Sequence, residues 1–214
     1  MMRIVSPEQL DSLPHTDAAA IRSRRELRWI NWIMGNHRWM ARELKLRAAP
    51  GARVLELGAG DGGLLEVVRA SGGVEASRWN AVDLAPVPEG WPAEAGWHQR
   101  DVFSATPLPG AEVVVANLFL HHFEAEGLMR IGGLLPAECR LILASEPARY
   151  VVHRVQGGWL GWLADFHAVT RHDMRCSIEA GFRGAELPDL LGLNGWRVRV
   201  WSTLLGAYRM CAWR

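Results

Sequence analysis

The stretch VLELGAGDGG, residues 54–63, decides the fold of this 214-residue chain. The apolar residues that open it predict a buried strand over residues 53–57. Gly58 and Gly60 let the backbone turn sharply out of that strand and approach a ligand closely, because glycine has no Cβ. A helix expected over residues 62–70 points free N–H groups at the turn, which favours an anionic group of a ligand.

Strands and helices alternate outward from this motif. Further strands are expected at residues 79–83, 96–100, 112–117 and 140–145, with a helix at 124–135 and a short one at 187–193. Such alternation predicts a parallel sheet with right-handed crossovers. The last strands, 196–202 and 207–213, are joined by too few residues for a crossover and should pair antiparallel. We therefore expect an α/β fold: a three-layer α/β/α, Rossmann-like sheet of about seven strands, mostly parallel, with an antiparallel C-terminal hairpin strand.

The remaining segments predict covering elements. Residues 16–48 have a helical pattern, with Thr16 or Asp17 as the cap, and Gly35-Asn36 divides the pattern. Residues 148–181 are the least regular part of the chain, and they follow the fifth strand. They therefore lie at the carboxyl edge of the sheet, where open α/β folds bind ligands.

Composition is ordinary for a globular protein: 49% of the residues are hydrophobic, 22% are charged and the net charge is +1. This balance favours neither nucleic acid nor membrane as a partner. The charge is unevenly distributed, +4 over residues 1–50, −6 over 51–149 and +3 over 150–214. Either these are solvated helix faces, or two basic flanks draw an anionic substrate toward an acidic middle segment.

Cysteine use and hydropathy suggest the compartment. The three cysteines are far apart and form no CxxC pair, so neither a disulfide framework nor a zinc site is indicated. The N-terminus becomes polar too early for a signal peptide, and no apolar run is long enough to span a membrane. We expect a cytoplasmic protein, a monomer or homodimer, that has no bound metal.

The glycine spacing alone leaves two ligands open. Gly58, Gly60 and Gly63 also satisfy GxGxxG, the weak fingerprint of dinucleotide binding. Glu56, two residues before the first glycine, favours the other ligand class. A carboxylate there could hold a ligand ammonium directly or through water, whereas it would repel a pyrophosphate.

VLELGAGDGG, followed by NAVDL (80–84), RDVFS (100–104) and VVVANLFLHHF (113–123), resembles the class I S-adenosylmethionine (SAM)-dependent methyltransferase family. The resemblance covers residues 50–146 well, and residues 186–201 resemble the closing helix and strand of the family. It implies one domain over residues 1–214. Its parts are an N-terminal helical cover (1–50), a cofactor-binding core (51–146), a lid or substrate-pocket insertion (147–181) and a closing helix and hairpin (182–214).

The resemblance also implies a cofactor site for SAM and its product S-adenosylhomocysteine (SAH). Asp83 would accept hydrogen bonds from both ribose hydroxyls, since a carboxylate has two oxygens. Asp101 would accept from the adenine amino group, unless it is a plain turn aspartate, and Val102 would offer a backbone N–H. The cofactor-binding residues expected are Glu56, Gly58, Ala59, Gly60, Asp83, Leu84, Asp101, Val102, Asn117 and Leu118.

Catalytic residues are expected after the fourth strand, beside the methyl group of the cofactor. Asn117 lies at the strand end, and His121 or His122 could take a proton from an acceptor hydroxyl. His121 is favoured because similar family members most often keep a histidine after that leucine. The alternative is that either histidine caps or fills the first turn of the next helix.

Substrate contacts are expected from the covering segments. Trp39, His153, Trp159 and Trp162 could line an aromatic or apolar pocket, although tryptophans in such segments can equally belong to a core. His153, His167 and His172 are weaker candidates for the base, and His37 fits a satisfied buried histidine.

We therefore expect a methyltransferase that acts on a small organic acceptor, by O-methylation of a phenolic or polyketide-like hydroxyl or by C-methylation of a related molecule. One alternative is an RNA or protein substrate, which the absence of RNA-reading motifs disfavours; DNA is not expected. A second alternative is a cofactor-binding scaffold without turnover.

Overall fold

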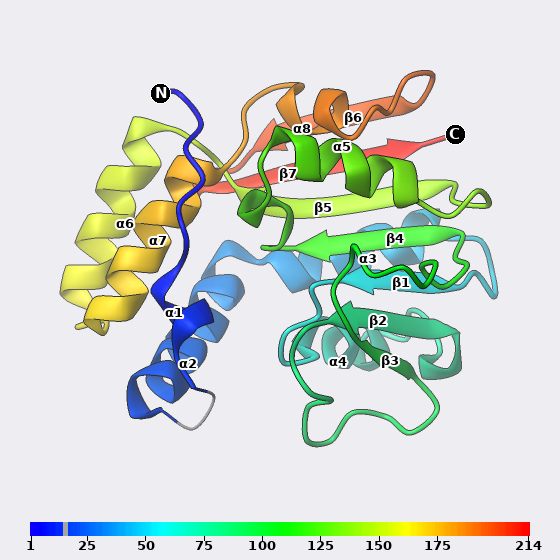
Figure 1. Cartoon of the computed structure of the whole chain (residues 1–214), viewed down its shortest axis with the longest axis horizontal. Coiled ribbons are helices and arrows are strands. Elements are labelled where there is room, and N and C mark those ends of the chain that lie inside the picture. Colours follow the sequence, from blue (N-terminus) through cyan, green and yellow to red (C-terminus); the bar gives the residue numbers. More distant parts are fainter. Residues whose placement is uncertain (15–16) are drawn as a thin grey trace.

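The computed structural model describes residues 1–14 and 17–214, and over these residues it contains one seven-stranded sheet (Figure 1). The strand order is β3-β2-β1-β4-β5-β7-β6. Neighbouring strands pair parallel except β7, which runs antiparallel to both β5 and β6. The expected fold class is confirmed, including the antiparallel end. The strands are β1 (Val54–Leu57), β2 (Trp79–Asp83), β3 (Gly96–Gln99), β4 (Val113–Asn117), β5 (Leu141–Pro147), β6 (Arg197–Ser202) and β7 (Ala207–Trp213).

Helices cover both faces of the sheet, because neighbouring residues of a strand point to opposite sides. Leu55 and Leu57 belong to one buried cluster, which includes Leu128 of α5 (Ala125–Leu134). Val54 belongs to a second cluster, which includes Leu64 of α4 (Gly63–Ala70). The result is a three-layer structure with two cores. The helices are α1 (Gln9–Ser12), α2 (Ala18–Met34), α3 (Asn36–Arg47), α4 (Gly63–Ala70), α5 (Ala125–Leu134), α6 (Val151–Leu163), α7 (Ala168–Ala180) and α8 (Glu186–Leu190), with short 3-10 turns at Ala76–Arg78 and Leu120–His122.

The N-terminal helices divide where the sequence predicted. Gly35 has a φ of +65°, a left-handed conformation that ends α2 and that glycine adopts without strain. At the other end of α2, the Asp17 carboxylate accepts the N–H of Ala19 and caps the helix. Thr16, the alternative cap, lies outside the described residues.

The expectation of an irregular segment after β5 was wrong, because this region folds into two long helices, α6 and α7. Its glycines hid the pattern, since glycine disfavours helices on average. Gly157 and Gly161 are buried against α7, and a Cβ on Gly161 would lie 3.0 Å from Cγ of Arg171. These glycines therefore permit close packing of the two helices.

The N-terminal segment, α1, α2, α6 and α7 gather beyond the carboxyl ends of the parallel strands (Figure 1). Helix α7 contacts α1, α2 and α6. Open α/β sheets bind their ligands at this edge, so the group covers the expected site. No helix in the described part of the chain is both long and apolar enough to cross a membrane.

Candidate active site

The loop between β1 and α4 forms the floor of the site. Gly58, Gly60 and Gly62 all have positive φ, at 70°, 58° and 76°. A Cβ on Gly58 would lie 2.1 Å from Cδ2 of Phe119, so this position admits only glycine. Helix α4 begins at Gly63, whose N–H is accepted by the Asp61 carboxylate at 3.2 Å, and its N-cap residue Gly62 has no side chain to cap the N–H groups that follow.

Asp83 lies at the end of β2 against the same loop. One oxygen of its carboxylate accepts the N–H of Gly60 at 2.8 Å, and the other accepts the N–H of Ala85 at 2.7 Å. Each oxygen can accept a second hydrogen bond. The structure therefore places Asp83 beside the glycine loop, as predicted, and the side chain of Leu84 next to it is 70% exposed.

Asp101 and Val102 follow β3, as expected, but they face different surroundings. The Asp101 carboxylate is exposed and accepts the N–H of Phe103 at 2.8 Å. The side chain of Val102 is buried in the core cluster that contains Leu57. Only the backbone of Val102 could therefore serve a ligand.

Glu56 is the buried acid beneath the loop. One of its carboxylate oxygens accepts the indole N–H of Trp79 at 3.0 Å, and the side chain has almost no exposed area. Burial raises the pKa of Glu56 to about 8, against the opposing effect of the Trp79 hydrogen bond, and the nearby Asp83 and Asp61 add to the rise. A strongly perturbed acid next to a ligand loop is typical of a functional site.

Asn117, at the end of β4, belongs to a polar cluster that sequence reasoning missed. Its amide nitrogen lies 3.2 Å from the side-chain oxygen of Asn31 and 3.2 Å from Nε2 of His37. The side-chain oxygens of Asn117, Asn36 and Ser145 are buried and have no hydrogen-bond partner among the described residues. Unpaired buried oxygens at a sheet edge are acceptors for the donors of a ligand. The sequence signal for this cluster is the pair Asn36-His37, although His37 fits the pattern of a buried core histidine equally well.

His121 is buried between two carboxylates. Its Nδ1 lies 2.7 Å from Oε2 of Glu146, and its Nε2 lies 3.4 Å from Oε1 of Glu8. Burial lowers the pKa of His121, but the hydrogen bonds to Glu146 and Glu8 outweigh it and raise the pKa to about 9. With Glu8 in this place, His121 is protonated at pH 7 and has no free nitrogen for an acceptor.

His122 stacks beside it in a different state. The two rings have centroids 4.2 Å apart, and Nδ1 of His122 lies 3.1 Å from the carbonyl oxygen of Phe119. Burial, followed by the charge of His121, lowers the pKa of His122 to about 4. The neighbouring histidines therefore differ in charge at neutral pH.

The N-terminal segment covers this side of the site. The resemblance implied a cover over residues 1–50, but no sequence signal placed Glu8 beside the histidines. Arg3 donates to the carbonyl oxygens of Phe123 at 2.7 Å and Ala180 at 2.8 Å. The Asp173 carboxylate accepts the N–H groups at the start of α1. Together these contacts hold Glu8 against the histidines.

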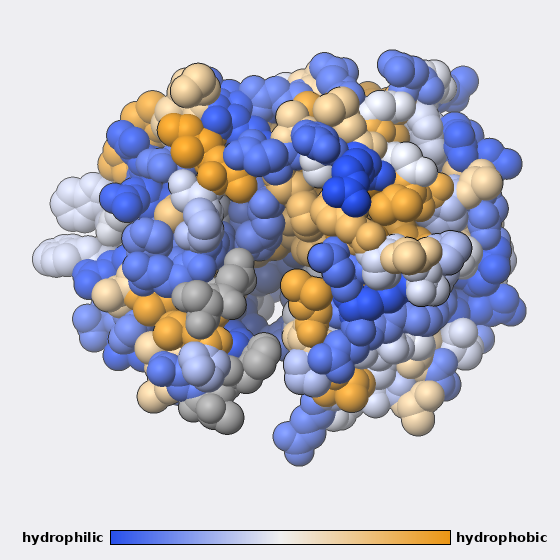
Figure 2. Space-filling model, viewed as in Figure 1, coloured by the Kyte–Doolittle hydropathy of each residue, from blue (hydrophilic) through white to orange (hydrophobic). Residues whose placement is uncertain are grey.

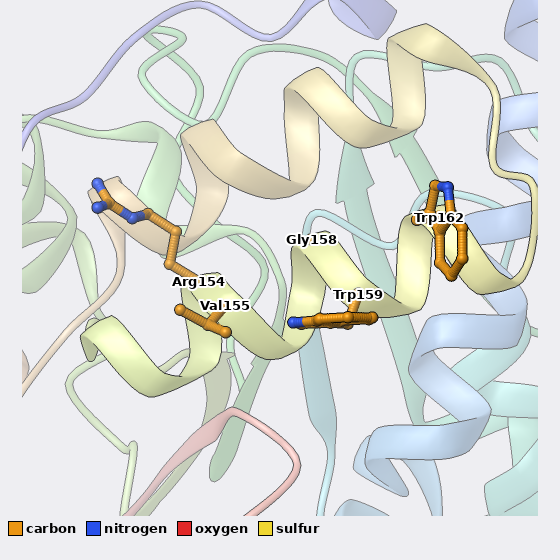
Figure 3. A pocket seen from close by; sticks show the side chains of 5 residues that line it. All are labelled: Arg154, Val155, Gly158, Trp159 and Trp162. Carbon is orange, nitrogen blue, oxygen red and sulfur yellow. The ribbon is translucent and has the colours of Figure 1, made fainter.

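The four residues predicted to contact substrate lie in different surroundings. Trp39 is buried in the core and packs edge-on against Trp201, and His153 is buried with Nδ1 near the carbonyl oxygen of Ala148. Trp159 and Trp162 are 62% and 66% exposed and project from the outer face of α6 (Figure 3). In the space-filling view, the side of the molecule formed by α6 and α7 carries hydrophobic groups scattered among hydrophilic ones (Figure 2). Of the four, Trp159 and Trp162 share one surface hollow, which is lined by Arg154, Val155, Gly158, Trp159 and Trp162.

The sheet order agrees with the Rossmann-like fold expected from the sequence. Solved structures with this fold resemble the whole chain. The plantazolicin methyltransferase BpumL, in complex with SAH and a monoazolic desmethylPZN analog, is 11% identical; the match covers 95% of this chain and 91% of that one, with a TM-score of 0.66. Human N-acetylserotonin methyltransferase, in complex with SAM, is 18% identical over 97% of this chain and 62% of that one, with a TM-score of 0.56.

The pyocyanin biosynthetic protein PhzM is also similar, at 17% identity over 96% of this chain and 60% of that one, with a TM-score of 0.56. No protein-family model and no curated protein matches the sequence. At these identities the likeness establishes the fold.

Proposed function

We propose that this protein is a SAM-dependent methyltransferase acting on a small organic acceptor, by O-methylation of a phenolic or polyketide-like hydroxyl or by C-methylation of a related molecule. The observation that carries the proposal is the Asp83 carboxylate hydrogen-bonded to Gly60 of the glycine loop. This contact supports the ribose assignment, because it sets a carboxylate with remaining acceptor capacity beside the glycine loop at the start of α4. The proposed cofactor site comprises the ten residues predicted from the sequence.

Charge favours SAM over a dinucleotide. Asp61 and Asp83 lie near the loop and add to the rise in the pKa of Glu56, so the loop has acids around it, and a cation bound there would favour the ionised form of Glu56. Acids attract the sulfonium and ammonium groups of SAM, whereas they would repel the pyrophosphate of NAD. Binding of SAH or SAM by BpumL and by N-acetylserotonin methyltransferase, as their structures are described, supports the same choice.

Methyl transfer needs mainly alignment, and positioning alone can supply about 7–11 kcal/mol of the barrier. We assign that role to Asn117 and the activation of the acceptor to His121 and His122. Glu146 is a positioning residue, because it holds Nδ1 of His121 and also accepts the N–H groups of Phe119 and Leu120. Direct proton transfer to His121 requires that Glu8 first leave Nε2, since that nitrogen is the only one that faces away from Glu146.

Calorimetry with the purified protein tests the cofactor assignment. We expect SAH to release heat and bind at one site per chain, and NAD to show no binding. Preference for NAD, or no binding of SAH, would refute the proposal. Incubation with labelled SAM and cell extract, followed by mass analysis, then identifies the acceptor.

The scaffold alternative makes a different prediction for the same protein. It expects tight SAH binding with no labelled product, and Asn117→Ala would leave the biological activity unchanged. An RNA substrate would instead give an affinity that falls steeply with salt.

A further inference from the structure

Three metal-ligating side chains from distant parts of the sequence converge at the end of β4. Glu8, His121 and His122 place one ligand atom each within 4.8 Å of one another. The Glu8 carboxylate lies 3.4 Å from Nε2 of His121 and 3.5 Å from Nε2 of His122. For zinc bound at its usual ligand distances in a tetrahedron, neighbouring ligand atoms are about 3.4 Å apart.

The hydrogen bonds of the two rings leave both Nε2 atoms facing one carboxylate. Nδ1 of His121 faces Glu146, and Nδ1 of His122 faces the Phe119 carbonyl oxygen, which can only accept. Each Nδ1 therefore carries the proton, and in a neutral ring Nε2 is a bare lone pair. A lone pair that faces a carboxylate is repelled. A second proton on Nε2 of His121 offsets this repulsion, but the lone pair of the neutral His122 still faces the Glu8 carboxylate and is repelled unless a cation lies between them. Protonating both rings would place two imidazolium ions 4.2 Å apart.

Two carboxylates, Glu8 and Glu146, face one imidazolium, that of His121, so negative charge in this cluster exceeds the positive charge directed at it. The side chain of Glu8 is 9% exposed and that of Glu146 is fully buried. Arg3 lies beside them, but its guanidinium donates to the carbonyl oxygens of His121, Phe123 and Ala180. A divalent cation would neutralise the two carboxylates.

We propose that Glu8, His121 and His122 form a binding site for a divalent transition-metal ion such as Zn²⁺. Two imidazoles and a carboxylate suit zinc or cobalt better than magnesium, which prefers oxygen ligands. The outer contacts fit as well. Glu146 holds His121, and Ser177 donates to Glu8, as hydrogen bonds from surrounding residues commonly orient metal ligands. This proposal departs from the sequence-based expectation of no metal, because Glu8 lies 113 residues before His121.

Three protein ligands leave the fourth position of a tetrahedral ion for another group, and His122, with 31% of its side chain exposed, is the most exposed of the three. If the proposed function holds, that fourth position accepts the oxygen of the acceptor, and the metal lowers the pKa of its hydroxyl. The hydroxyl proton passes to water, and the oxygen–carbon bond to the methyl group forms as the carbon–sulfur bond breaks. His121 then acts as a metal ligand rather than as the base.

Metal titration tests the site directly. We expect the EDTA-treated protein to bind one Co²⁺ per chain, with the visible absorption of a tetrahedral site, and Zn²⁺ to displace it while Mg²⁺ does not. Glu8→Gln and His122→Ala should each weaken Co²⁺ binding more than tenfold. His98→Ala removes an imidazole that pairs with Asn80 outside the cluster, so it should bind Co²⁺ like the wild type.

Absence of Co²⁺ binding to the wild type, or equal binding by His122→Ala and wild type, would overturn the proposal. Circular dichroism checks that each variant folds, and His122→Ala provides the test if Glu8→Gln does not. SAH titration of the same samples separates the two proposals. Co²⁺ binding without SAH binding would refute the proposed methyltransferase function and support the metal site. SAH binding without Co²⁺ binding would refute the metal site and leave the proposed function standing.

Discussion

Glu56 shows how one residue couples the fold to pH. Its carboxyl is neutral in the folded protein up to about pH 8, whereas in the unfolded chain it ionises at its ordinary pKa of 4.5. Between these two values the folded state binds more protons than the unfolded state, so this residue makes stability fall as pH rises. Above pH 8 the contribution is level.

We expect Glu56→Gln to remove that decline. Urea unfolding of wild type and variant at several pH values from 5 to 9 gives the difference in the free energy of unfolding. The difference should shift in favour of the variant as pH rises, because Gln has no proton to lose. The lowered pKa values of His37 and His122 act in the opposite direction and are common to both proteins. A difference that does not change with pH would contradict the assignment.

Asp83 is the residue on which cofactor affinity should depend most. Asp83→Ala is expected to weaken SAH binding by about 1.5–3 kcal/mol, as for hydrogen bonds to a charged group. Calorimetry measures the change. Glu75→Ala, which removes an exposed acid before β2, should bind SAH like the wild type. Unchanged affinity in Asp83→Ala would refute the ribose assignment.

His121 should matter for turnover rather than for cofactor affinity. His121→Ala leaves the glycine loop and Asp83 untouched, so we expect a large fall in the rate of product formation and little change in SAH affinity. The ratio of the two losses is the measurement. Losses of equal size would make His121 a structural residue.

At the residue scale, the sequence predicted the neighbourhood of the glycine loop better than that of the other candidate site residues. Gly58, Gly60 and Asp83 follow one another in fixed order along strand ends, so local pattern suffices to place them together. Glu8, Asn31 and His37 reach the site through the packing of covering segments, which no local periodicity encodes. Only the structure shows that these three residues lie near the strand ends.

Among the elements, α5 offers a test of packing with two neighbouring glycines. A Cβ on Gly132 would lie 2.2 Å from the carbonyl oxygen of Leu191, whereas a Cβ on Gly133 meets nothing within 4 Å. Gly133→Ala should stabilise the protein by about 0.5–1 kcal/mol, because alanine favours helices. Gly132→Ala should destabilise it, because backbone must move. Chemical denaturation measures the free energy of unfolding of the two variants. Equal changes would contradict the close contact between Gly132 of α5 and the backbone of Leu191.

The core strands were predicted to within one or two residues because both faces are buried. Val113–Asn117 and Leu141–Pro147 are continuous apolar or buried runs, a pattern that fixes their type. Helices α6 and α7 were harder because Gly157, Gly158 and Gly161 interrupt the first of them. Gly157 and Gly161 allow α6 to pack closely against α7, and helix propensity alone does not predict such contacts.

For the whole molecule, β7 is the strand on which the sheet depends. It pairs along its full length with β5 and along most of it with β6. Removal of residues 207–214 should leave both neighbours with unpaired edges, which promote association between chains. We expect the truncated protein to be recovered in the insoluble fraction, while Arg214→Ala stays soluble. Soluble, folded truncated protein, judged by circular dichroism, would contradict this.

The place of β7 also has a consequence for synthesis on the ribosome. Strand β6 is translated before β7, yet it reaches the sheet only through β7. In a nascent chain that has emerged as far as residue 202, strands β1 to β5 can pair, but β5 has an unpaired edge and β6 has no strand to pair with. Assembly of the sheet is completed from the inside, by a strand inserted between two that already exist, so the interval before residue 213 emerges is when a chaperone has most to protect.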